Sequence, residues 1–156
     1  MNTYLIVKTL HILSATLMVG TGFGTAFYLF FANRSGCVPA QAVVAKWVCR
    51  ADWWFTTPAV IFQPLSGLWM MRELGVPWSV TWIWGALALY ALAGICWLPV
   101  VVLQIRMAKM AAQAAAENKD DMPPEYWRAA RYWELLGYPA FAAMLVVYFL
   151  MVLKPY

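Results

Sequence analysis

His11 is the only histidine in the 156-residue chain, and it lies in the apolar stretch VKTLHILSATLMVG, residues 7–20. Ionisable side chains inside a membrane segment are rare, and they usually face the interior of a helix bundle and have a partner there. An imidazole in this position could ligate a metal or a haem iron. It could also hydrogen-bond to a carbonyl or hydroxyl group of a neighbouring helix. Both roles stay open at this point.

The side chains that could complete a site with His11 are those predicted to lie at its depth in the membrane. His11 comes about 7 residues into the first apolar segment, which places it roughly 10 Å below the membrane surface. If the following segments alternate in direction, residues 66–71, 84–90 and 146–151 reach the same level. This layer begins at Ser66, and its reachable polar or sulfur-bearing side chains are Met70, Met71, Tyr90, Tyr148 and Met151. Met18 shares a helix face with His11, so it is excluded as an opposite axial ligand.

The residues do not support ordinary hydrolytic chemistry. No carboxylate is predicted at the depth of His11, and no Ser-His-Asp arrangement can be drawn. Asp52, Glu73 and Glu134 all lie near predicted membrane boundaries. The three cysteines have no metal-ligand spacing and are predicted to be free thiols, with Cys96 a small core residue. If the protein is a catalyst, a bound cofactor must supply the reactivity.

The elements that would position these residues are membrane-spanning helices. Apolar residues make up 64% of the chain and charged residues 12%, a composition that a soluble domain could not hide from water. Four apolar stretches, near 3–31, 54–71, 80–103 and 137–153, approach or exceed the roughly 20 residues that cross a bilayer. The prediction is a single all-α membrane domain, residues 1–156, built as a four-transmembrane up-and-down helix bundle.

Two segments between the spans are also predicted to be helical. Residues 38–54 mix charged residues with Val and Trp, which suits a helix lying at the membrane interface. The helix that begins near residue 80 is rich in helix formers as far as about residue 116. It should therefore extend about 20 Å beyond the membrane and return after NKDDMPPE as a cytoplasmic helical hairpin, residues 104–134.

The basic residues predict how the chain is oriented. The net charge is +4, and the loops on one side carry Arg34, Lys46, Arg50, Arg106, Lys109, Lys119, Arg128 and Arg131. The opposite side carries only Lys8, Arg72 and Lys154. The positive-inside rule therefore predicts a multi-pass protein with both termini on the non-cytoplasmic side. The basic charge reports this orientation and does not indicate a nucleic-acid partner.

Gly20 and Gly24 form a small-xxx-small pair in the first span, with Gly22 beside it. Such pairs let another helix backbone approach closely. The partner could be a neighbouring helix of the same bundle, or the first span of a second copy in a homodimer.

Three stretches of the chain resemble the HemJ-type protoporphyrinogen oxidases and their wider kin, the CopD-type copper-resistance proteins. These stretches are VKTLHI, RADWWFTTPAVIFQPLSGLWMM and AFAAMLVVYFLMVLKPY. The resemblance spans nearly the whole chain and is typical of a divergent branch. It implies a small four-helix protein of the bacterial inner membrane that binds haem b and takes part in the oxidation of protoporphyrinogen. On this resemblance, His11 matches the haem-ligand histidine.

The sequence departs from this family at the second haem ligand. HemJ-type proteins have a lysine after the tryptophan that opens the third span, where WIWGALA here offers Gly85 or Ala86. The acid before the proline of the fourth span is replaced by Gly137 and Tyr138. A second ligand would then have to be a methionine such as Met70, a water molecule, or His11 of a second subunit.

Two functional hypotheses follow. The first is a HemJ-related haem-b-binding or redox-associated protein, with His11 as axial ligand and Lys154, Arg72 or Lys8 placed for the haem propionates. Each of these three cations could instead be an interface anchor. The second hypothesis is an accessory membrane subunit without cofactor, whose hairpin 104–134 binds a partner protein. Copper handling has less support, because one histidine and scattered methionines form no recognisable copper site.

Overall fold

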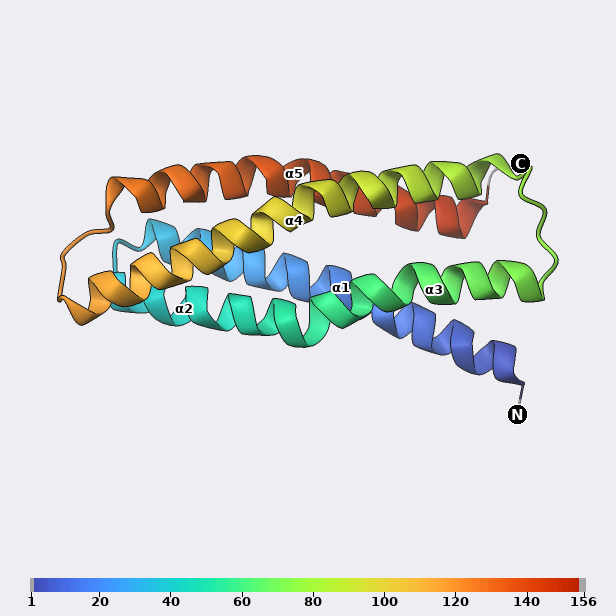
Figure 1. Cartoon of the computed structure of the whole chain (residues 1–156), viewed down its shortest axis with the longest axis horizontal. Coiled ribbons are helices and arrows are strands. Elements are labelled where there is room, and N and C mark those ends of the chain that lie inside the picture. Colours follow the sequence, from blue (N-terminus) through green and yellow to red (C-terminus); the bar gives the residue numbers. More distant parts are fainter. Residues whose placement is uncertain (1, 155–156) are drawn as a thin grey trace.

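The computed structural model describes residues 2–154, which form long helices lying side by side (Figure 1). In chain order the elements are α1 (Thr3–Arg34), α2 (Val38–Ala51), the π-helix η1 (Asp52–Thr56), α3 (Thr57–Glu73), α4 (Thr81–Ala116) and α5 (Pro124–Leu153). No strand occurs among the described residues, so the all-α prediction is confirmed. The last two residues of the closing Lys-Pro-aromatic motif lie outside the described part of the chain.

Three of these helices have the length and hydropathy to cross a membrane, namely α1, α4 and α5. The remaining predicted span, 54–71, falls on η1 and on α3, which is 17 residues long. In Figure 1, α3 runs beside α1 and parallel to the axis of the bundle. The structure therefore supports a helical membrane protein, and the count of four spans stays a prediction.

The predicted helix 38–54 forms as α2 and η1, and its location at a membrane interface stays a prediction. Helix α2 does not lie across the bundle but continues through η1 into α3 and packs alongside α4 (Figure 1). The junction is a π-helix that ends just before Pro58, a residue with no N–H to donate to the carbonyl four residues earlier. Thr57 instead donates its backbone N–H to the carbonyl oxygen of Asp52, five residues back. This wider turn directs Asp52 into the bundle, where its side chain is buried.

A second proline ties α3 to α4. Pro64 lies inside α3 and leaves the carbonyl of Val60 without its usual helical donor. The hydroxyl of Tyr90 from α4 donates to that carbonyl oxygen at 2.7 Å. A neighbouring helix thus satisfies the freed carbonyl, as expected for a proline inside a membrane bundle.

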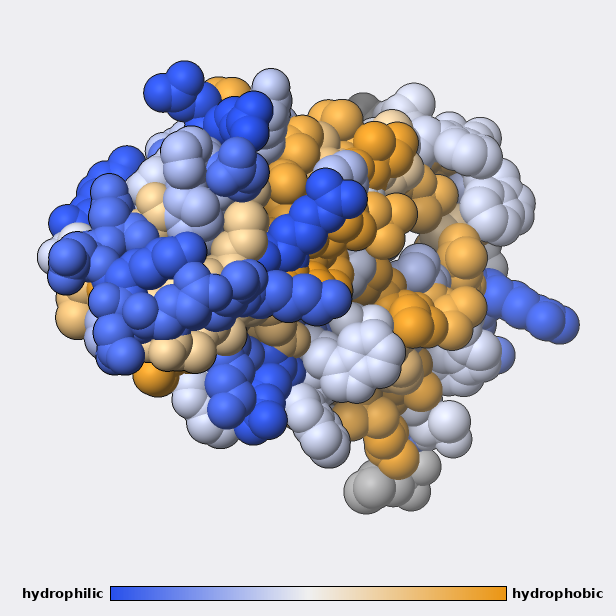
Figure 2. All heavy atoms as spheres, turned by 60° about the vertical axis from the view of Figure 1, so that its left-hand side comes forward, coloured by the Kyte–Doolittle hydropathy of each residue, from blue (hydrophilic) through white to orange (hydrophobic). Residues whose placement is uncertain are grey.

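The hairpin is present and has a core of its own. The end of α4, the start of α5 and helix α2 bury Val48, Met107, Ala111 and Trp133 among other apolar residues. Tyr126 is fully buried at the centre of this region. Figure 2 shows the hydrophilic side chains gathered over this end of the molecule, with apolar side chains covering the part beyond it. We call this region the hairpin end, and the opposite region, with the chain termini, the terminal end.

The helices associate as two pairs. Helix α1 packs against α3, helix α4 packs against α5, and α2 contacts both α1 and α4 at the hairpin end. Away from α2, the space between the two pairs is spanned by side chains such as Tyr90. The arrangement leaves room for a pocket between the pairs.

Candidate functional site

His11 lies between α1 and α3 with both ring nitrogens in hydrogen bonds. Its Nε2 lies 3.0 Å from the side-chain amide of Gln63, and its Nδ1 lies 2.7 Å from Oγ of Ser66. The Ser66 hydroxyl donates in turn to the carbonyl oxygen of Phe62. Gly67 leaves space for the ring, since a Cβ there would lie 3.4 Å from His11 Cε1. The predicted depth match between His11 and Ser66 is confirmed.

This arrangement does not fit a haem held by His11. An iron atom needs the lone pair of a ring nitrogen, and both ring nitrogens of His11 are engaged in hydrogen bonds, one with Gln63 and one with Ser66. His11 also does not line the large pocket between the helix pairs, which begins on α1 at Met18, about 10 Å farther along the helix. Among residues 2–154, no three His, Cys, Asp or Glu side chains come together as metal ligands.

The other predicted site residues do not join His11 through polar contacts. Arg72 and Lys154 are exposed at the terminal end, and neither side chain makes a hydrogen bond or ion pair with the described residues. Met70 is half-buried on α3, one turn beyond Ser66. Gly20 and Gly24 approach no other helix, because an added Cβ at either would meet no atom within 4 Å. The predicted homodimer through these glycines stays a prediction.

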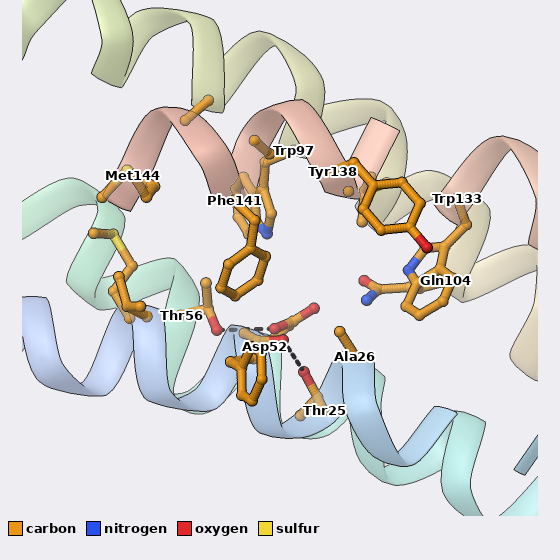
Figure 3. Close-up of a pocket in the computed structure, with 18 of the residues that line it drawn as sticks. Thr25, Ala26, Asp52, Thr56, Trp97, Gln104, Trp133, Tyr138, Phe141 and Met144 are labelled. Atoms are coloured by element: carbon orange, nitrogen blue, oxygen red, sulfur yellow. Dashed lines mark hydrogen bonds between the residues drawn. The ribbon is translucent and has the colours of Figure 1, made fainter. Parts of the chain in front are cut away.

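A pocket of about 500 Å³ lies between the two helix pairs, in the half of the bundle nearer the hairpin end. Figure 3 shows its walls, and the lining residues come from α1, η1, α3, α4 and α5. Most of the lining is apolar or aromatic, including Trp97, Tyr138, Phe141 and Met144. A volume of this size is within the range of small-molecule sites, which are apolar cavities with a few placed polar groups.

Three buried polar side chains of the pocket lie together at the end nearer the hairpin. Asp52, Thr56 and Gln104 are all buried, and Figure 3 shows their side chains directed into the same space. The Thr56 hydroxyl donates to Oδ1 of Asp52 at 2.8 Å. The Oε1 atom of Gln104 is buried and has no hydrogen-bond donor among the described residues. A buried acceptor of this kind costs about 1–3 kcal/mol until something donates to it.

Two contacts between α1 and α5 border the pocket. Arg34 forms an ion pair with Glu134 at 3.2 Å, and its guanidinium carbon lies 3.3 Å from the centre of the Phe30 ring. Farther along α1, Phe23 packs edge-on against Phe141 with ring centroids 5.5 Å apart. Phe23 and Phe30 from α1 and their α5 counterparts Phe141 and Glu134 all line the pocket, so these contacts lie on its side between α1 and α5.

Burial raises the pKa of the Asp52 carboxyl above its usual value, while hydrogen bonds from Thr56 and Gln104 oppose the shift. A raised folded-state pKa stabilises the fold fully below the unfolded-state pKa, and this stabilisation is lost as the pH rises through the folded-state pKa. We therefore expect Asp52→Asn to unfold at a higher temperature than the wild type at pH 7, with a smaller difference near pH 4.

Thermal unfolding in detergent micelles between pH 4 and pH 8 measures this effect. Asp120→Asn is the matched control, because Asp120 is exposed in the turn between α4 and α5. A stability difference between Asp52→Asn and the wild type that does not change with pH would contradict the assignment.

The polar cluster of Asp52, Thr56 and Gln104 was not predicted from the sequence. Asp52 was assigned to a membrane boundary, and Thr56 and Gln104 were given no role. The available signal was the pair of polar residues Asp52 and Gln104, one just before the predicted span at 54 and one just after the predicted span at 103. Antiparallel segments bring those two boundaries to the same level, so the two side chains could have been predicted to meet there.

Comparison with known proteins identifies the family of this chain. No curated protein and no solved structure matches the chain. A family model described as "Predicted integral membrane protein (DUF2269)" matches residues 5–155. This match agrees with a membrane protein and does not point specifically to the HemJ-type or CopD-type proteins that the motifs resemble. Because the match covers nearly the whole chain, the protein belongs to the DUF2269 family of predicted integral membrane proteins.

Proposed function

We propose that this protein binds a lipophilic amphiphile in the pocket between its helix pairs, with the polar head of the ligand at Asp52 and Gln104. The observation that carries the proposal is the buried Oε1 of Gln104, which has no donor and lies at the polar end of an otherwise apolar pocket. A head group with a hydroxyl or another hydrogen-bond donor would satisfy this atom. The long apolar walls would hold an alkyl, isoprenoid or ring-containing body.

The position of the pocket in the membrane supports an amphiphile. Gln104 follows the predicted span 80–103, so the polar end lies at the membrane boundary. Met18 on α1 and Met144 on α5 line the pocket toward the middle of the bundle. A lipid-like molecule has the same polarity, with its head at the interface and its chain in the hydrocarbon. Such a molecule could pass from the bilayer into the pocket without crossing water.

The orientation that goes with this proposal is the one predicted from charge. Eight basic residues belong to the loops and helices of the hairpin end, which supports a cytoplasmic location for that end. We propose that the chain lies in the bacterial inner membrane with both termini outside the cytoplasm. Protease access to the turn at residues 117–123 in inside-out and right-side-out vesicles separates the two orientations.

The proposal is tested with two photoactivatable probes of equal chain length. One is hexadecanol with a diazirine in its chain, and the other is the corresponding methyl ether, which has no hydroxyl donor. We expect the wild type to be labelled more strongly by the alcohol. In Gln104→Leu the ratio of labelling by the alcohol to labelling by the ether should fall about fivefold, because one net hydrogen bond contributes about 1 kcal/mol.

Gln113→Leu is the matched control on the same helix, since Gln113 is exposed and bonds to Glu117. It should keep the preference for the alcohol. Equal labelling of the wild type by alcohol and ether would contradict a hydrogen-bonded head group. Labelling that Gln104→Leu and Gln113→Leu change equally would contradict the assigned position.

The haem-b hypothesis from the sequence resemblance stays a prediction, and the His11 geometry offers it no support. It would require Gln63 to swing away from Nε2 and a second ligand to come from elsewhere. Visible spectra of the purified protein, oxidised and reduced, test it directly. A Soret band that is lost in His11→Ala would establish the haem. The structure adds one observation to the accessory-subunit hypothesis, namely that the hairpin 104–134 is folded around a packed core.

A further inference from the structure

A second concave site lies on another face of the α4–α5 pair. It is a groove of about 470 Å³ near the hairpin end, and none of its residues lines the large pocket. Its basic side chains are Arg106, Lys109 and Arg128, and its single acidic side chain is Glu125. Glu125 pairs with Arg128 at 3.1 Å. Arg106 and Lys109 therefore have no carboxylate partner among the described residues.

The groove also has apolar walls on the side toward the membrane. Leu103 and Tyr132 lie at that side, and Met110 and Ala129 complete the lining. Basic side chains above apolar ones match a ligand that has a negative head and an apolar chain.

The predicted span boundary at residue 103 puts Arg106 and Lys109 close to the lipid head groups. Leu103 is the last residue of the predicted span 80–103, and Arg106 and Lys109 follow it by about 4.5 and about 9 Å along the helix. The head-group layer of a bilayer is roughly 5–8 Å thick on each side. Arg106 lies within that layer, and the flexible side chain of Lys109 can reach back into it.

We propose that this groove binds the phosphate head group of an anionic phospholipid, with Arg106 and Lys109 as its main contacts. Arg128 contacts both Glu125 and the bound phosphate. The lipid chains lie against Leu103 and Tyr132 at the membrane side. This site is independent of the large pocket, so either proposal can fail without the other.

The test uses nanodiscs that contain phosphatidylglycerol and phosphatidylcholine in equal amounts. The protein is released from the nanodiscs, and native mass spectrometry then identifies the lipid that stays bound. We expect the wild type to retain phosphatidylglycerol preferentially. Each basic side chain near an anionic head group contributes about fivefold to binding. The double variant Arg106→Gln/Lys109→Gln should therefore reduce the preference by about 25-fold.

The matched control is Lys46→Gln/Arg131→Gln, which removes the same charge at exposed positions of the hairpin end outside the groove. It should keep most of the preference. An equal loss in both double variants would overturn the proposal, because general surface charge would then explain the binding. Excess inorganic phosphate should leave phosphatidylglycerol bound. If phosphate alone displaces the lipid, the groove is a site for free anions and the assignment to a lipid is wrong.

Discussion

Tyr126→Ala is expected to lower the free energy of unfolding by about 3–5 kcal/mol, the usual cost of removing a buried aromatic side chain. Tyr126 has no exposed surface and packs at the centre of the core shared by α2, α4 and α5. Its hydroxyl donates to Oδ1 of Asn33 at 2.6 Å, and the carbonyl oxygen of Asn33 accepts from Gln41. The substitution would leave both a cavity and an unpaired acceptor.

Unfolding with sodium dodecyl sulfate in mixed micelles measures this effect. Tyr126→Phe keeps the packing and loses only the hydroxyl, so it should cost about 1–3 kcal/mol. Tyr28→Ala is the exposed control, since Tyr28 faces outward from α1, and it should change stability little. A cost for Tyr126→Ala no larger than that for Tyr28→Ala would mean that the hairpin core is not part of the folded bundle.

Gly94→Phe is expected to reduce labelling by the hexadecanol probe at least tenfold. Gly94 lines the large pocket from α4, and a Cβ added there would meet no atom within 4 Å. The new ring would therefore extend into the pocket instead of pressing on the backbone of a neighbouring helix. A phenylalanine ring fills a substantial part of a pocket of about 500 Å³ and removes space for the ligand.

Gly24→Phe is the matched control for this prediction. Gly24 is also in a helix with open space beside its Cα, but it does not line the pocket. Both variants should fold, which thermal unfolding checks. Full labelling of a folded Gly94→Phe protein would show that the probe binds elsewhere.

Much of the fold could be predicted because the features that determine it are local. Long apolar stretches predict helices, and the turns follow residues with special backbone needs, such as Gly36 and Gly75, which adopt positive φ values. The extension of α4 to Ala116 follows from its run of good helix formers. The packing of α2 against α4 could not be predicted, because its amphipathic pattern suits a membrane surface and a protein surface equally.

The candidate site was harder to predict, because it depends on contacts between distant segments. His11 stands out in the sequence, and its match in depth with Ser66 was foreseen, but nothing local reveals that Gln63 occupies the other ring nitrogen. Asp52 looked like a boundary residue. It becomes a pocket residue because the π-turn before Pro58 directs it inward, opposite Gln104.

The proposed binding of an amphiphile is tested most directly by measuring which end of the molecule lies beside Gln104. Two hexadecanol probes are compared, one with the diazirine beside the hydroxyl group and one with it at the far end of the chain. We expect the first probe to label peptides around Gln104 and Trp133, and the second to label peptides around Met144. The reverse order would contradict the proposal, as would labelling by both probes that favours outward-facing residues such as Ile95 and Val152.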